Sequence, residues 1–76
     1  MSYYLKVKKL DIKTGQSNIA LLNDTEAMHY GIHAGDKIRI SWDKKNIIAE
    51  ANTSEEKIKA GSIGLYKDIW EKHLWL

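Results

Sequence analysis

Residues 31–42 read GIHAGDKIRISW, and their pattern decides the fold class. Gly35 and Asp36 indicate a tight turn over residues 33–36, which an aspartate carboxylate holds through backbone amides. The next six residues alternate strictly between polar and apolar, the period of a β-strand with one buried face. Three of them are expected to point inward: Ile38, Ile40 and Trp42. A polar turn then leads to a second strand at residues 47–51, so this stretch predicts a β-hairpin.

A short helix is predicted just before this hairpin, over residues 24–30. Asn23 is suited to accept hydrogen bonds from the free amides of the first helical turn, and Glu26 is placed to reach back to the Asn23 amide. Gly31 supplies the left-handed residue that ends the helix. The preceding residues 18–22 are almost wholly apolar, which predicts a short strand buried on both faces.

The two ends of the chain add further strands. Residues 3–12 are rich in alternating and β-branched side chains and precede a glycine turn, so they predict a strand. A charged loop is expected at residues 53–57. Residues 58–65 predict a strand interrupted by Gly61 and Gly64, which suit sharp turns and close backbone approach.

Apolar side chains at helical spacing predict a second short helix over residues 66–74. The two halves of the chain then share an order of apolar strand, short helix and tight connection, so we expect a compact barrel of two interlocked halves. A chain of 76 residues supports one core, and it contains no proline and no linker. Residues 1–76 are therefore predicted to form a single domain that is mainly β with two short helices.

Composition excludes several classes of protein. The absence of cysteine removes both a disulfide framework and a thiolate metal site. No apolar run resembles a signal peptide or approaches the roughly 18 residues of a membrane span, so we expect a cytoplasmic protein that makes no membrane contact. The net charge is only +2, whereas non-specific binding to nucleic acid needs clustered cations. The densest lysine cluster is expected to be a solvated strand face, which makes nucleic acid an unexpected partner; it comprises Lys6, Lys8, Lys9 and Lys13.

Side chains capable of chemistry do not form a recognisable set. His29 and His33 have the spacing of two metal ligands on a helix, but Gly31 ends the predicted helix between them and no cysteine completes the set. The segment from Gly61 to Gly64 lacks the lysine and the third glycine of phosphate-binding loops. The ten acidic residues are scattered through turns, caps and charged faces. We therefore predict no catalytic residue, no metal site and no cofactor.

The aromatic residues are expected in the core or at an interface, because so small a domain without phenylalanine needs other large side chains. The last residues of the chain carry more apolar surface than one short helix can hide. We predict a contact between subunits in this region, formed by Trp70, Leu74, Trp75 and Leu76.

Four blocks of sequence carry a resemblance to a known family: residues 5–7 with 10–12, 20–23, 31–40 and 58–66. Through them the chain resembles the amino-terminal domain of archaeal AMP phosphorylases. In that family the domain is a double-psi β-barrel placed before the thymidine-phosphorylase-like catalytic part. The resemblance runs through nearly the whole chain, and its last block is the most telling.

The resemblance implies a parent enzyme that phosphorolyses nucleoside 5'-monophosphates to a base and ribose 1,5-bisphosphate. For this domain it implies a role in assembly, as a homo-oligomer in contact with the catalytic domains of the parent chain. No catalytic residue carries over, because the family's phosphate-binding and catalytic residues belong to the domains that follow.

The resemblance also raises the question of a sixth strand, which the family barrel has after its second helix. Here the chain ends at Leu76 before such a strand is evident. Either the sequence is cut short and the barrel is incomplete, or residues 74–76 form a stub that leaves an open sheet edge. An open edge favours self-association or domain swapping.

Two other functions remain open. Residues 31–40 and the following hairpin also resemble the AbrB-type transition-state regulators, which are swapped-hairpin dimers that bind DNA. That family carries a basic, proline-containing segment before its helix, whereas residues 21–24 end in an acid and hold no proline, which counts against DNA. The other is an adaptor barrel that binds protein partners, like the amino-terminal domain of AAA-type unfoldases; it shares the double-psi fold, so fold alone does not separate the two.

Overall fold

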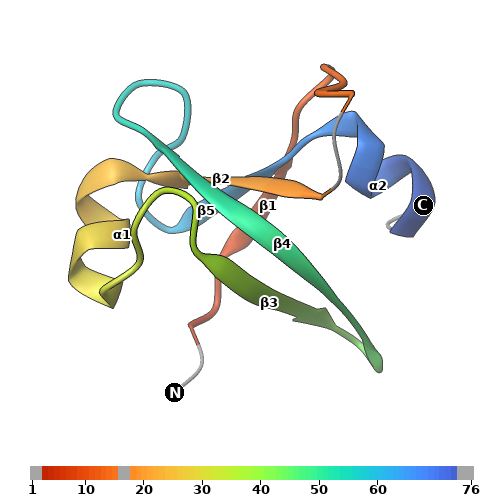
Figure 1. The fold of residues 1–76 in the computed structure, drawn as a ribbon, viewed down its shortest axis with the longest axis horizontal. Coiled ribbons are helices and arrows are strands. Elements are labelled where there is room, and N and C mark those ends of the chain that lie inside the picture. The colour runs from red at the N-terminus through yellow and green to blue at the C-terminus, as the bar shows by residue number, and fades with distance from the viewer. Residues whose placement is uncertain (1–2, 16–17, 74–76) are drawn as a thin grey trace.

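The computed structural model describes residues 3–15 and 18–73, which form a curled sheet with a short helix at either end (Figure 1). The elements in chain order are β1 (Lys6–Lys9), β2 (Ile19–Asn23), α1 (Asp24–Tyr30), β3 (Lys37–Trp42), β4 (Lys45–Ser54), β5 (Ser62–Leu65) and α2 (Lys67–His73). The five strands lie in the order β1-β5-β2-β4-β3, so β1 and β3 are the two edges. The prediction of a mainly β fold with two short helices is confirmed.

The pairing of the strands relates the two halves of the chain. β1 pairs parallel with β5, and β4 pairs parallel with β2 in the same way. β2 and β5 are antiparallel to one another at the centre, and each is followed by a helix. Exchanging β1 with β4, β2 with β5 and α1 with α2 therefore leaves the pairing unchanged. This is the architecture of a double-psi β-barrel, and it is incomplete because β3 has no counterpart after α2 within the described residues.

β4 is longer than predicted, because it serves two neighbours in turn. Its first part, Lys45 to Glu50, is antiparallel to β3, and its second part, Glu50 to Ser54, is parallel to β2. The predicted charged loop at residues 53–57 is thus wrong for its first two residues, whose backbone pairs with the end of β2. β4 also begins at Lys45 and not at the predicted residue 47, so the hairpin turn consists of only two residues, 43 and 44, with Asp43 at φ 50°.

The outer strands are shorter than predicted. The strand expected over residues 3–12 is regular only in β1, and the one expected over 58–65 only in β5. Gly61 has a φ of 89°, a left-handed conformation that bends the chain before β5 begins. The ladder between β1 and β5 is therefore limited to four residue pairs. The second helix was expected over 66–74, and the structure describes it as Lys67–His73.

The core includes side chains from both halves of the chain and from both helices. Its buried cluster consists of Ala20, Leu22, Ala27, Ala49, Ala51, Ile63, Leu65 and Ile69. Ile38 and Ile40 of β3 pack against it, as the alternation predicted. β2 is the most central strand: its first four residues are all buried, which confirms the prediction of a strand covered on both faces.

Local contacts explain why α1 begins and ends where the sequence predicted. The side chain of Asn23 accepts a hydrogen bond from the Glu26 amide, over 3.1 Å. Gly31 has a φ of 72°, and the amides of Gly31 and Ile32 donate to the carbonyls of Met28 and Ala27, the pattern of a Schellman C-cap. A capping box was also predicted, and this is wrong. The Glu26 carboxylate accepts instead from the Gly61 amide at 2.8 Å, a bond that ties α1 to the loop before β5.

Candidate functional site

Glycines and capping groups hold the loops around the sheet. In the turn before β3, the His33 amide donates to the Asp36 carboxylate at 2.8 Å, and Gly35 has a φ of 95°. Gly61 bends the chain into β5. Gly64 lies inside β5, where a Cβ atom would stand 2.6 Å from Ile58 Cδ1, so the close approach expected of it comes from the neighbouring side chains.

The predicted interface residues fall only partly within the described chain. Trp70 is half-buried: it packs against the core, its indole N–H donates to the Leu10 carbonyl at 3.0 Å, and Lys9 lies 5.5 Å from its ring. Leu74, Trp75 and Leu76 lie outside the described residues. Their contact between subunits stays a prediction.

Three apolar side chains in and next to the edge strand β1 are exposed. Tyr4 is 94% exposed, Val7 48% and Ile12 57%. We call these three side chains, with the outer edge of β1, the β1 surface. Its lysines are exposed as well, and within the described part of the chain β1 pairs with a strand on one side only. An unpaired edge with apolar side chains is a typical site of strand addition or subunit contact.

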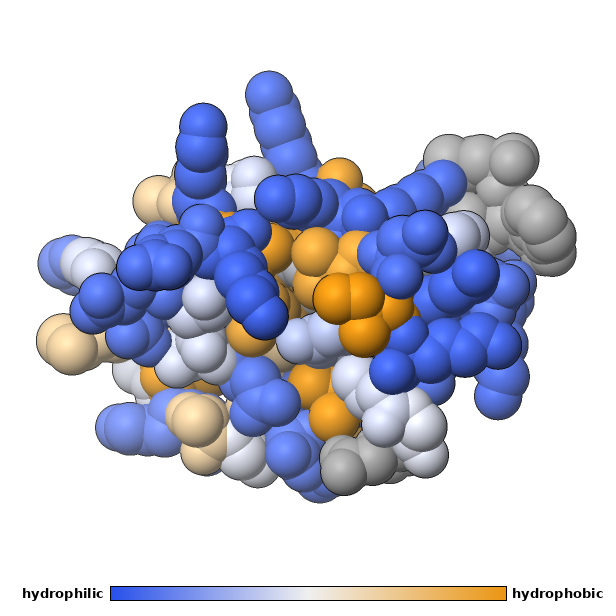
Figure 2. Space-filling view, turned by 90° about the horizontal axis from the view of Figure 1, so that it is seen from above, coloured by the Kyte–Doolittle hydropathy of each residue, from blue (hydrophilic) through white to orange (hydrophobic). Residues whose placement is uncertain are grey.

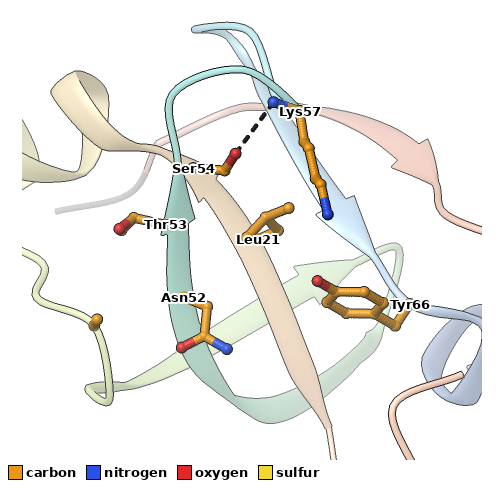
Figure 3. Close-up of a pocket in the computed structure, with 7 residues that line it drawn as sticks. Leu21, Asn52, Thr53, Ser54, Lys57 and Tyr66 are labelled. Atoms are coloured by element: carbon orange, nitrogen blue, oxygen red, sulfur yellow. Dashed lines mark hydrogen bonds between the residues drawn. The ribbon is translucent and has the colours of Figure 1, made fainter. Parts of the chain in front are cut away.

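An open hollow of about 340 Å³ lies on the other face of the sheet from the core, over β2 and β4 (Figure 3). Leu21 forms its floor, opposite Asn52 in β4. Lys57 and Tyr66 approach it from the connections on either side of β5, and Figure 3 shows their polar ends around Leu21 together with the Asn52 amide. The sequence did not indicate this hollow, because its lining comes from four separate segments.

Two titratable groups are perturbed by their surroundings. The Thr14 amide donates to the Asp68 carboxylate at 2.9 Å, and this hydrogen bond is the main reason why the pKa of Asp68 is lowered. Desolvation raises the pKa of the Tyr30 hydroxyl, and the neighbouring Glu26 carboxylate raises it further. Tyr30 also stacks on Tyr3, with ring centroids 3.7 Å apart, which fastens the start of the described chain to α1.

The two histidines with metal-ligand spacing lie in different local structures. His29 is in the last turn of α1, whereas His33 lies 3.6 Å from the Asp36 carboxylate in the following turn. Among residues 3–15 and 18–73, no three His, Cys, Asp or Glu side chains gather where they would hold a metal ion.

The helices of the described residues are too short and too polar to cross a membrane. Figure 2 shows one face of the molecule as mainly hydrophilic, with apolar residues reaching the surface at its centre.

Comparison with known proteins connects this fold to one enzyme. The AMP phosphorylase of Methanococcoides burtonii is 36% identical over 67 residues, which is 88% of this chain and 13% of that protein. That of Methanosarcina barkeri is 34% identical over the same share of each chain. This chain resembles the amino-terminal domain of archaeal AMP phosphorylases. The AMP phosphorylase of Thermococcus sibiricus, from another genus, is 36% identical over 64 residues. No protein-family model matches the chain.

The chain spans only about 13% of the length of the AMP phosphorylases that it matches first. The blocks on which the resemblance rests lie in and around β1, β2 and β5, and in the turn before β3 together with the first part of β3; the glycine turns and the helix cap are among them.

Proposed function

We propose that this chain is the non-catalytic amino-terminal assembly domain of an AMP phosphorylase. The parent enzyme would phosphorolyse nucleoside 5'-monophosphates to a base and ribose 1,5-bisphosphate, with its catalysis in the remainder of the protein. The single observation that carries this proposal is the alignment: 88% of the chain matches, and it matches 13% of the relative. A segment of that size corresponds to one small domain.

The β1 surface supports the assembly role. Among residues 3–15 and 18–73, no strand pairs with the outer side of β1, and the Lys6 and Leu10 amides both donate inward, to the Gly61 and Leu65 carbonyls. The period of a strand then directs the Val7 amide outward. The exposed apolar side chains of Tyr4, Val7 and Ile12 accompany it. We propose a homo-oligomeric, cytoplasmic enzyme in which this surface meets another copy of the domain, and in which the domain also contacts the catalytic domains of the parent chain.

A chimeric enzyme tests the proposal. In the AMP phosphorylase of Methanococcoides burtonii, the 67-residue segment that matches is either deleted or replaced by this chain. The deletion is expected to lower the number of subunits per particle, obtained by dividing the molar mass from light scattering by the mass of that variant's subunit, and the replacement to restore it. The intact enzyme is the control. A deletion variant with as many subunits per particle as the intact enzyme, or a chimera with no more than the deletion variant, contradicts an assembly role.

The alternatives give different outcomes. An AbrB-type regulator would bind random duplex DNA with an affinity that falls steeply with salt. If the domain is an adaptor barrel, the intact enzyme, the deletion variant and the chimera should all have the same oligomeric state, and the domain should bind a separate protein. The lysines of β1 are exposed, as a surface that binds DNA phosphates requires. DNA binding should therefore be measured together with the oligomeric state of the chimera.

A further inference from the structure

The hollow over Leu21 lies on a row of residues that share one face of the sheet. Lys8 is opposite Gly64, Gly64 is opposite Leu21, and Leu21 is opposite Asn52. Directly opposed residues in a sheet project to the same side. Gly64 contributes no side chain to the row, and Ile58 packs into that space. The hollow therefore lies over Leu21, between the Ile58 side chain on one side and Asn52 on the other.

The loop that brings Lys57 to the hollow is fastened at several points. The Lys57 amide donates to the Ser54 hydroxyl at 3.1 Å, and the Lys57 carbonyl accepts from the Lys8 ammonium at 3.3 Å. The next carbonyl, that of Ile58, accepts from the Asn23 side chain at 2.9 Å. The backbone from which the Lys57 ammonium extends is thus fixed before any ligand arrives, which lowers the entropic cost of binding.

Three hydrogen-bond donors reach the hollow without a partner in the described part of the chain. They are the Lys57 ammonium, the Asn52 carboxamide N–H groups and the Tyr66 hydroxyl, whose ends surround Leu21 in Figure 3. No carboxylate lines the hollow. Glu55 and Glu56 precede Lys57 in the loop but are not among the lining residues. The lining therefore offers donors and one positive charge, which is the chemistry that recognises an oxyanion.

We propose that this hollow binds the oxyanion group of a small metabolite, a phosphate or a carboxylate, through Lys57, Asn52 and Tyr66. A volume of about 340 Å³ is at the small end of the range for ligand pockets and suits a group of that size with a short organic part. Leu21 and the Tyr66 ring supply an apolar wall for that part. This site is separate from the β1 surface, and its existence does not depend on the assembly role.

Titration of the isotope-labelled full chain, followed by NMR, tests the proposal. Sodium phosphate is the ligand in one arm and sodium acetate in the other, with ionic strength held constant by sodium chloride. Saturating shifts are expected for the Asn52 side-chain amide and the Lys57 backbone amide. Saturation at lower phosphate than acetate identifies a phosphate site, and the reverse order identifies a carboxylate site. Shifts that fail to saturate in both arms overturn the proposal.

Matched variants separate a site from general attraction by lysines. Lys57→Gln is expected to weaken binding roughly tenfold, the usual effect of a charged hydrogen bond. Lys59→Gln makes the same charge change in the same exposed loop, outside the hollow, and is expected to bind as the unmodified chain does. Tyr66→Phe removes one donor without changing charge and is expected to weaken binding severalfold. Equal weakening by both lysine variants, or no effect of Lys57→Gln, overturns the proposal.

Discussion

Gly64→Ala is the substitution whose effect the structure specifies most closely. An added Cβ would lie 2.6 Å from Ile58 Cδ1 and 2.9 Å from Leu10 Cδ1, both well inside van der Waals contact. Ile58 is fully buried, so its methyl group has no solvent to turn into. The neighbours must therefore shift within a packed region where β1, β5 and the loop before β5 meet.

The expected cost of Gly64→Ala follows from two opposed effects. Overpacking of a close-packed site costs about 1–3 kcal/mol, whereas replacing glycine by alanine stabilises by roughly 0.4–1 kcal/mol through the unfolded chain. At the middle of both ranges, the net loss of unfolding free energy is about 1–2 kcal/mol. For a domain of this size, that lowers Tm by about 4–16 °C.

Urea unfolding, monitored by tryptophan fluorescence at one fixed protein concentration, measures this loss. The midpoint should fall while the slope with denaturant stays the same. Ile58→Val removes the methyl group nearest to the new Cβ, and alone it is expected to cost about 0.5–1.5 kcal/mol. Combined with Gly64→Ala it should cost less than the sum of the two. A neutral Gly64→Ala variant, or strictly additive costs, would refute the packing argument.

Three further predictions concern the helix-capping residue Asn23, the stability at acid pH that depends on Asp68, and the edge strand β1. Asn23→Ala removes both the helix cap and the bond to the loop carbonyl, and should lower the unfolding free energy by about 1–2 kcal/mol in the same assay; an unchanged midpoint would contradict it. The pKa of Asp68 is lowered in the folded chain, so its charge stabilises the fold at neutral pH, and this contribution disappears as the pH falls below 3.8, its ordinary value. Thermal unfolding of Asp68→Asn should therefore show a deficit at pH 7 that narrows in acid, and a deficit constant with pH would count against it. Val7→Lys should weaken self-association measured by sedimentation, whereas Met28→Lys, on a helix residue that is 80% exposed, should not; equal effects would remove the β1 surface from the account.

The elements that depend on neighbouring residues were predicted well. The bounds of α1 follow from Asn23 and Gly31, which act within one turn of the helix. Those of β3 follow from the alternation of six residues. The length of β4 was missed, because its last residues are strand only through pairing with β2, some thirty positions earlier in the sequence. Local pattern carries no information about such a partner.

The surfaces were harder to predict than the fold. Glu26 binds the amide of Gly61, 35 residues away, in preference to the local box that its spacing suggested. The hollow gathers Leu21, Asn52, Lys57 and Tyr66 from separate segments, and none of these residues is distinctive in the sequence alone. The resemblance to AMP phosphorylases was recognisable because turns and caps need particular residues at fixed positions.

The central claim is that this chain assembles through exposed edge and apolar surface, and molar mass by light scattering tests it most directly. The monomer mass is 8.7 kDa. We predict a mass that rises above this value with protein concentration. The rise should be larger at high salt, because salt screens repulsion between the lysines of adjoining β1 strands. A mass that stays at 8.7 kDa at every concentration and salt level would contradict the account.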